Sequence, residues 1–327
     1  MIIKKLGFAC LTSLLIILFS CSLFTESDKK GIGDDEEVDI SHFSIENYPR
    51  VDGSTSCHPL QRVIACEILD VDYRWYDWDG MLRVWAFDDD PFKKAAEDYI
   101  NNIQHSGTHG SYVNLINDSV DVIIAARLPS EDELALAAGL QVEILTEAIA
   151  LDAFVFILNT QNPVNNLTIE QIRGIYSGVY TNWNDVGGIN AAINPYQRNR
   201  NSGSQELMDA LVMQGLQMVD APQMVLNSMM GPINKLNEDP HGIGYTVYFF
   251  NTFMAPRDNI KLCAVNGVHP GLETISSGSY VFTAKVYTAI RSGTSSESTA
   301  YLLWKWLQTR EGQKAVGLSG YVPYSDI

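Results

Sequence analysis

Residues 196–208, Tyr-Gln-Arg-Asn-Arg-Asn-Ser-Gly-Ser-Gln-Glu-Leu-Met, place two arginines and a turn of small residues directly before a helical pattern. The Ser-Gly-Ser triplet at 202–204 stands at the N-terminus of the helix predicted over 205–214. A helix start offers free backbone N–H groups and a positive dipole end to an anion, and the two hydroxyls add donors. Arg198 or Arg200 can add a planar guanidinium fork that suits a tetrahedral oxyanion. The competing interpretation is an ordinary serine N-cap beside surface arginines.

Two further segments have the same character. Residues 52–56, Asp-Gly-Ser-Thr-Ser, follow a predicted strand and open a helix, and residues 107–111, Gly-Thr-His-Gly-Ser, open another. Taken singly, each fits an ordinary capped loop. Three such helix starts in one chain, one of them with arginines, predict that the three loops converge on an anion site.

Outward from these loops, short apolar runs alternate with amphipathic stretches, which predicts an α/β fold. The expected strands are 50–52, 120–125, 149–158, 242–248 and 281–290. The expected helices are 59–69, 91–103, 111–117, 131–138, 169–177, 205–214 and 298–309. Residues 70–90 hold three tryptophans and seven aspartates and predict a strand–turn–strand insertion with a packed aromatic face, in preference to a calcium loop. Residues 159–194 predict a loop, a helix and a second loop.

The composition limits the function. The chain has 327 residues, 46% of them hydrophobic, and its 22 basic against 39 acidic residues give a net charge of −17. That length predicts two domains with an ordinary globular core. So negative a surface repels nucleic acid, which excludes a nonspecific DNA or RNA partner.

The N-terminal segment is interpreted as a targeting signal. Residues 1–20 combine Lys4 and Lys5 with a short apolar run, as in a secretory signal peptide. Leu-Phe-Ser-Cys at 18–21 resembles a bacterial lipobox, which predicts that Cys21 carries lipid. Residues 21–45 are then an acidic, flexible tether that holds an exported protein at a bacterial membrane. An uncleaved anchor helix is the alternative.

Motifs for catalysis or metal binding are absent from the sequence. It contains no HExxH, GxSxG, Walker or GxGxxG pattern, and no Cys/His spacing for a metal. We therefore predict neither enzyme activity nor a cofactor or metal. Cys57, Cys66 and Cys263 are expected to be buried, unbridged side chains. His58 and His109 are expected to be half-buried neighbours of the loops, although both could approach a ligand.

From about residue 48 to the C-terminus, the sequence resembles the phosphate-binding proteins of bacterial phosphate ABC transporters. Besides the three loops, the resemblance lies in Asn-Pro-Val-Asn-Asn-Leu-Thr-Ile-Glu-Gln-Ile-Arg-Gly-Ile-Tyr-Ser-Gly at 162–178 and Thr-Asn-Trp-Asn-Asp-Val-Gly-Gly at 181–188. It continues in His-Gly-Ile-Gly-Tyr at 241–245, Val-Asn-Gly-Val at 265–268, and near the C-terminus in Glu-Gly-Gln-Lys at 311–314 and Gly-Tyr-Val-Pro at 320–323.

The resemblance implies a two-lobed, type II periplasmic-binding-protein fold with a ligand cleft between the lobes. Lobe one would comprise 46–149 and 250–327, and lobe two 150–249. The protein would be a monomer that closes its lobes around inorganic phosphate and delivers it to a permease. By position, the resemblance implies that the phosphate-binding residues are Thr55, Ser56, Thr108, Arg198, Ser202, Gly203 and Ser204.

One position departs from the family pattern. Many relatives have an aspartate, which accepts the proton of hydrogen phosphate, where this chain has Ala126 followed by Arg127. Arg127 is either a further ligand contact or part of a surface or interlobe ion pair. Without the aspartate, the argument for phosphate over another tetrahedral oxyanion is weaker. A sensor of such an anion, a surface adhesin and a secreted phosphatase are the alternative functions.

Overall fold

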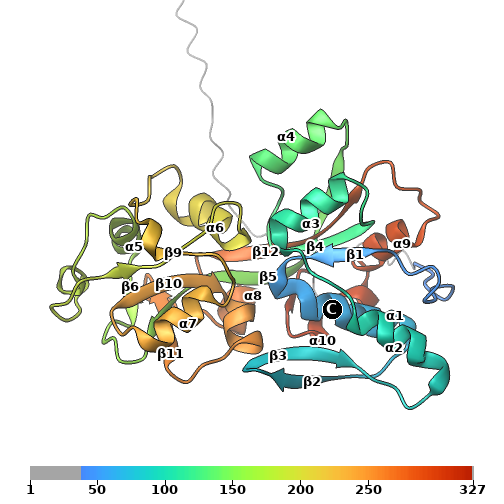
Figure 1. Ribbon diagram of the computed structural model, residues 1–327, viewed down its shortest axis with the longest axis horizontal. Helices are drawn as coiled ribbons and strands as arrows, with labels where there is room; N and C mark the ends of the chain where they lie inside the picture. Colours follow the sequence, from blue (N-terminus) through green and yellow to red (C-terminus); the bar gives the residue numbers. More distant parts are fainter. Residues whose placement is uncertain (1–37, 326–327) are drawn as a thin grey trace, which may run out of the picture.

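The computed structural model describes residues 38–325, and its central element is the long strand β5 (Ile144–Asn159). The N-terminal part of β5 pairs antiparallel with β12 (Thr283–Arg291). Its C-terminal part pairs antiparallel with β10 (Gly242–Val247) and β11 (Ile260–Val265). Most of β5 is buried, in keeping with its nearly continuous apolar sequence. β5 therefore connects two groups of elements in Figure 1: a first group around its N-terminal part and a second group around its C-terminal part.

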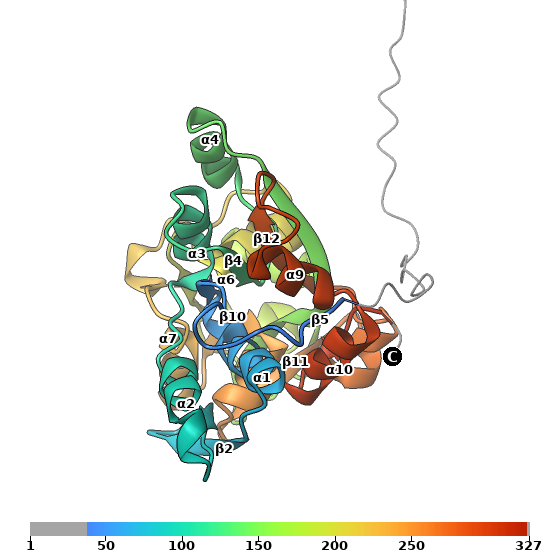
Figure 2. The same cartoon turned by 90° about the vertical axis from the view of Figure 1, so that its right-hand side faces the viewer.

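The first group contains the N-terminal strands and most of the longer helices. β1 (Val51–Gly53) pairs parallel with β4 (Val122–Ala125), and β4 pairs antiparallel with β12. Because β1 and β4 are parallel, their carboxyl ends lie at one edge of the sheet, and the loops after them start there. Figures 1 and 2 show the helices of this group: α1 (His58–Leu69), α2 (Lys94–Asn101), α3 (Gly107–Ile116), α4 (Glu131–Gly139), α9 (Thr299–Trp306) and α10 (Arg310–Leu318).

The second group surrounds the other end of β5. β6 (Asn166–Leu167) pairs with β11, and β7 (Asn194–Pro195) pairs with β10. A separate two-strand pair joins β8 (Gln197–Arg198) to β9 (Val225–Leu226). The helices are α5 (Ile169–Tyr176), α7 (Gly231–Glu238) and the short α6 (Gly203–Leu207), which continues as a π-helical segment, Met208–Met213. The short elements α8 (Leu272–Ser276) and β13 (Val322–Pro323) both contact β5.

The expected lobe boundary at residue 250 does not coincide with the point at which the strands return from the C-terminal to the N-terminal part of β5. β11 follows that boundary, yet it pairs with the same part of β5 as β10 does. Among the described residues that follow the second group, only β12 and β13 pair with the N-terminal part of β5. The division into lobes remains a prediction, and the pairing places β11 with the residues expected in lobe two.

Most predicted elements are confirmed. Each of the five expected strands and seven expected helices overlaps an observed element, although α3 begins four residues earlier than expected and α6 changes to π-helix. The aromatic insertion is the hairpin of β2 (Tyr73–Trp78) and β3 (Met81–Ala86), in which the Tyr76 ring packs edge-on against two tryptophans. Elements not predicted from the sequence are β11, α7, α8, α10 and the two-residue strands β6, β7, β8, β9 and β13.

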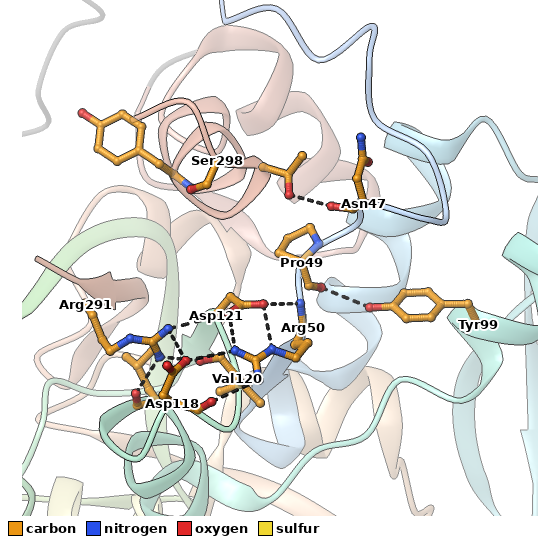
Figure 3. A network of polar contacts seen from close by, with 12 residues as sticks. Asn47, Pro49, Arg50, Tyr99, Asp118, Val120, Asp121, Arg291 and Ser298 are labelled. Atoms are coloured by element: carbon orange, nitrogen blue, oxygen red, sulfur yellow. Dashed lines mark hydrogen bonds and ion pairs between the residues drawn. The ribbon is translucent and has the colours of Figure 1, made fainter. Parts of the chain in front are cut away.

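A polar network ties the start of the folded chain to the first group (Figure 3). The Arg50 guanidinium forms ion pairs with Asp118 at 3.0 Å and Asp121 at 2.6 Å. Arg291 on β12 joins the same carboxylates, and its contact with Asp118 is 2.7 Å. Tyr99 on α2 donates a hydrogen bond to the Pro49 carbonyl. These contacts fix the position at which β1 enters the sheet.

The predicted state of the three cysteines is confirmed: Cys57, Cys66 and Cys263 are buried and form no disulfide. Burial raises the pKa of each thiol to about 12, so they are not nucleophiles at neutral pH. Across residues 38–325, no helix has the length and apolarity that a bilayer span requires. The predicted signal peptide, Cys21 and most of the tether lie outside the described residues.

Candidate anion-binding site

The three loops singled out in the sequence line a single cavity of about 640 Å³. From the first group come the loop after β1 and the start of α3, and from the second group come the segment after β8 and the start of α6. All seven residues implied as ligands lie on its wall: Thr55, Ser56, Thr108, Arg198, Ser202, Gly203 and Ser204. The convergence of the loops is thus observed, whereas the role of these residues as ligands stays a prediction.

Ser54, which the sequence analysis did not select, connects the first two loops. Its hydroxyl lies 2.7 Å from the Thr108 hydroxyl and accepts a hydrogen bond from the Ala126 N–H at 2.9 Å. Asp52 adds a second tie, because its carboxylate accepts hydrogen bonds from the Ser106 N–H and the Asn114 side chain. Both residues are buried. They hold the loop after β1, the loop after β4 and the start of α3 in a fixed arrangement.

The third loop approaches the second very closely. Ser202 caps α6 by accepting a hydrogen bond from the Gln205 N–H. At the next position, a Cβ on Gly203 would collide with the Thr108 hydroxyl. Glycine is therefore required for the observed contact between the starts of α3 and α6. The two helix starts expected to share an anion lie against each other.

Arg198 is buried, yet no carboxylate within residues 38–325 forms an ion pair with it. Its Nε donates a hydrogen bond to the Leu226 carbonyl at 3.0 Å, and its backbone N–H donates to the Tyr245 hydroxyl at 2.9 Å. Burial lowers the pKa of the guanidinium, although arginine remains charged at neutral pH. A buried, uncompensated cation is costly, so this side chain is poised for an anionic ligand. Arg200, in contrast, is exposed and lies 3.5 Å from Asp132.

The sulfur of one methionine contacts two hydrogen-bond donors of the candidate site. The Met229 sulfur lies 3.6 Å from Arg198 Nη1 and 3.7 Å from the Ser204 hydroxyl. Thioether sulfur is a weak acceptor. An anion that takes both donors must displace these contacts. No local pattern identified Met229, because its loop comes about 25 residues after the start of α6.

Arg127 is part of a buried ion pair and does not line the cavity. Both terminal nitrogens of its guanidinium lie 2.8 Å from the Glu133 carboxylate, one on each oxygen. The side chains of both residues are nearly inaccessible to solvent. From the sequence, both a ligand contact and an ion pair at the surface or between lobes were possible for Arg127. The ion pair is present, but it is interior and lies between the segment after β4 and α4. Ala126 does line the cavity.

Two histidines also line the cavity. His109 Nδ1 lies 3.0 Å from Glu133 Oε1, and 40% of the His109 side chain is exposed. The His105 ring packs 4.7 Å from the His58 ring. His58 itself contacts the Ile103 carbonyl through Nε2, and burial lowers its pKa to about 3. The expected half-buried state is confirmed for His58 and His109, and only His109 of these two reaches the cavity.

The remaining lining residues supply neutral polar and apolar groups, and no aspartate or glutamate of residues 38–325 lines the cavity. The cavity wall therefore presents one buried arginine, one exposed arginine, hydroxyls and helix-start N–H groups. Within the described residues, no cluster of three or more His, Cys, Asp or Glu side chains is arranged to hold a metal ion. The arrangement can bind an anion by charge-assisted hydrogen bonds.

A two-group α/β fold with an anion-binding cavity between the groups is typical of solute-binding proteins. The chain belongs to the PBP superfamily: the model of the PBP superfamily domain matches residues 78–318. Among individual proteins, it is 26% identical to the phosphate-binding protein PstS of Borreliella burgdorferi over 216 residues, which are 64% of this chain and 74% of the relative.

Solved structures agree with this fold. A putative phosphate ABC transporter substrate-binding protein from Clostridium perfringens, with bound phosphate, superimposes with a TM-score of 0.62 at 20% identity, covering 84% of this chain and 98% of that one. An ABC-type phosphate transport receptor from Vibrio cholerae gives a TM-score of 0.58 at 21% identity, over 83% and 98% of the two chains. The expected α/β fold and family resemblance are confirmed. These relatives are binding proteins and a receptor, in agreement with the prediction that the chain is not an enzyme.

Proposed function

We propose that this protein captures inorganic phosphate outside the cytoplasm and delivers it to an ABC transporter permease. The observation that carries the proposal is Arg198, a buried guanidinium without a carboxylate partner among the described residues, at a cavity that three helix starts share. The names of the Borreliella and Clostridium relatives support phosphate as the anion. Hydroxyls of Thr55, Ser56 and Thr108 would contact it from one side, and residues 202–204 with Arg198 from the other.

Lobe closure follows from where these donors lie. Because they come from both groups of elements, an anion gains most contacts when the two groups approach each other, so its binding favours the closed state. Lobe one would comprise 46–149 and 250–327, with β11 assigned instead to lobe two. The predicted lipid on Cys21 would keep the monomer beside the permease.

Isothermal titration with phosphate, sulfate and molybdate tests the ligand. We expect phosphate to bind with micromolar or tighter affinity, and Arg198→Ala to abolish binding, because it removes the buried cation. Arg200→Ala is the matched control in the same segment and should cause a much smaller loss. If phosphate gives no heat while another oxyanion binds, the proposed ligand is wrong.

Another tetrahedral oxyanion is the second candidate. It is favoured by Ala126 and by the lack of a carboxylate on the cavity wall among the described residues, since a carboxylate there would repel a fully ionised anion. The same titrations decide between the two candidates.

A further inference from the structure

We propose that His109, held by Glu133, is the residue by which this site selects hydrogen phosphate over sulfate. The proposal rests on the proposed function and adds a specificity-determining group to it. The two anions have similar size and shape, but hydrogen phosphate carries a proton that sulfate lacks. A site can separate them with an acceptor that has no proton to donate, because sulfate would leave that acceptor unpaired.

The Glu133 carboxylate orients the His109 ring. Burial would raise the pKa of this carboxyl, but the hydrogen bonds and charge of Arg127 outweigh burial, and the pKa is lowered. Glu133 is therefore ionised at neutral pH and can only accept hydrogen bonds. Its Oε1 lies 3.0 Å from His109 Nδ1, so Nδ1 carries the proton that fills this contact.

With Nδ1 as the donor to Glu133, the neutral His109 ring has a lone pair at Nε2. This ring edge lies on the side of the imidazole away from Glu133, and His109 lines the cavity with 40% of its side chain exposed. In this tautomer Nε2 can accept a proton from a P–OH group but can offer none to a sulfate oxygen. Glu133 thereby acts as a positioning residue, itself anchored by Arg127 and the Ser130 N–H.

Apart from the weakly accepting Met229 sulfur, the other side-chain acceptors on the cavity wall do not discriminate in this way. Hydroxyl groups can rotate to donate instead, and asparagine amides present N–H groups as readily as oxygen. His105 also lines the cavity, but no hydrogen bond among the described residues fixes its tautomer, so either ring nitrogen can present a proton. Within this set, His109 alone has its proton committed to a buried carboxylate.

The test is the ratio of phosphate to sulfate affinity in full-length protein, measured by calorimetric titration at pH 8. His109→Asn retains an N–H donor close to the place of Nδ1 and can keep the tie to Glu133, but it has no group at the position of Nε2. His109→Phe removes both. We expect phosphate affinity to fall by about tenfold or more in both variants, with sulfate binding changed by less than threefold. His105→Phe is the matched control and should keep the wild-type ratio.

Equal losses for phosphate and sulfate in His109→Asn would show a structural role and overturn the inference. A wild-type protein that binds both anions equally well would overturn it too, while leaving oxyanion binding intact. If the wild-type protein binds no phosphate, the proposed function fails together with the inference.

Discussion

Asp152 allows a quantitative prediction about pH and stability. It lies within β5, between the parts that pair with the two groups, and only 4% of it is exposed. Its Oδ1 accepts hydrogen bonds from the Ala153 N–H at 2.8 Å and from the Phe249 N–H at 3.0 Å, just after β10. Its Oδ2 is buried without a partner in the described chain. Asp152 thus ties the middle of β5 to the segment that follows β10.

Burial raises the pKa of this carboxyl from 3.8 to about 7, against the lowering effect of the two N–H donors. Because the folded-state pKa is the higher one, the folded protein binds the proton more tightly than the unfolded chain does. The stabilisation is present below the unfolded pKa and is lost as the pH rises to about 7. At about 1.4 kcal/mol for each tenfold change, this difference amounts to about 4 kcal/mol.

Asp152→Asn isolates this effect, because it keeps the acceptor for the Phe249 N–H and cannot ionise. Chemical denaturation of both proteins between pH 4.5 and 8 should show the variant gaining about 3 kcal/mol relative to wild type as the pH rises. At pH 8 the variant should be the more stable by only about 0–2 kcal/mol, because the buried amide N–H without an acceptor costs about 1–3 kcal/mol and offsets part of this gain.

In the difference between wild type and variant, the contributions of other titrating groups to the pH dependence of stability cancel. The pKa of His58 is lowered to about 3, so its contribution to stability is lost as the pH falls below 6.5, opposite in sign to Asp152. Both proteins contain His58, and its effect cancels in the difference. Near Asp152, Cys57, Tyr248 and Tyr321 all have raised pKa values and do not titrate in this range. A stability difference that stays constant from pH 4.5 to 8 would refute the reasoning.

Two further predictions concern the cavity, and a third concerns the buried Tyr321. Met229→Leu should raise phosphate affinity about two- to tenfold in calorimetric titration, because it removes the sulfur that contacts two site donors, whereas Met230→Leu should leave it within twofold. Gly203→Ala should weaken phosphate binding at least tenfold, because the new Cβ collides with Thr108; unchanged affinity would show that the two helix starts need not touch. Tyr321→Phe should lower the free energy of unfolding by about 1–3 kcal/mol in denaturant titration, because the buried hydroxyl donates a hydrogen bond to the Ser56 carbonyl. A loss below about 0.5 kcal/mol would mean that this carbonyl finds another donor in the variant.

The helix starts at the cavity could be predicted from the sequence because each is a local pattern. A strand followed by Gly, Ser and Thr and then by a helical period is readable within about 15 residues. The parallel pairing of β1 and β4 brings their following loops to one edge, so the general convergence is predictable as well. The hairpin of residues 70–90 was readable for the same reason, from its dense aromatic and turn residues.

The missed features depend on distant partners. α7 and α10 are short and half polar, and they form because one face packs on the sheet rather than from a strong local pattern. Met229 belongs to the site only because its loop folds back to Arg198. Arg127 illustrates the limit most clearly: the sequence places an arginine beside the cavity, but only the structure shows that Glu133 takes both of its terminal nitrogens.

The distribution of charge explains how an acidic protein can bind an anion. The chain carries −17 overall, and residues 46–327, without leader and tether, still carry −14, yet no carboxylate of residues 38–325 lines the cavity. Glu133, the carboxylate contacting the lining residue His109, is neutralised by Arg127 and presents only the imidazole to the cavity. Charges farther away than about 10 Å are screened by salt, so the short-range donors and Arg198 dominate the potential that the ligand meets. Capture should therefore gain little from long-range attraction, and the association rate should depend only weakly on ionic strength.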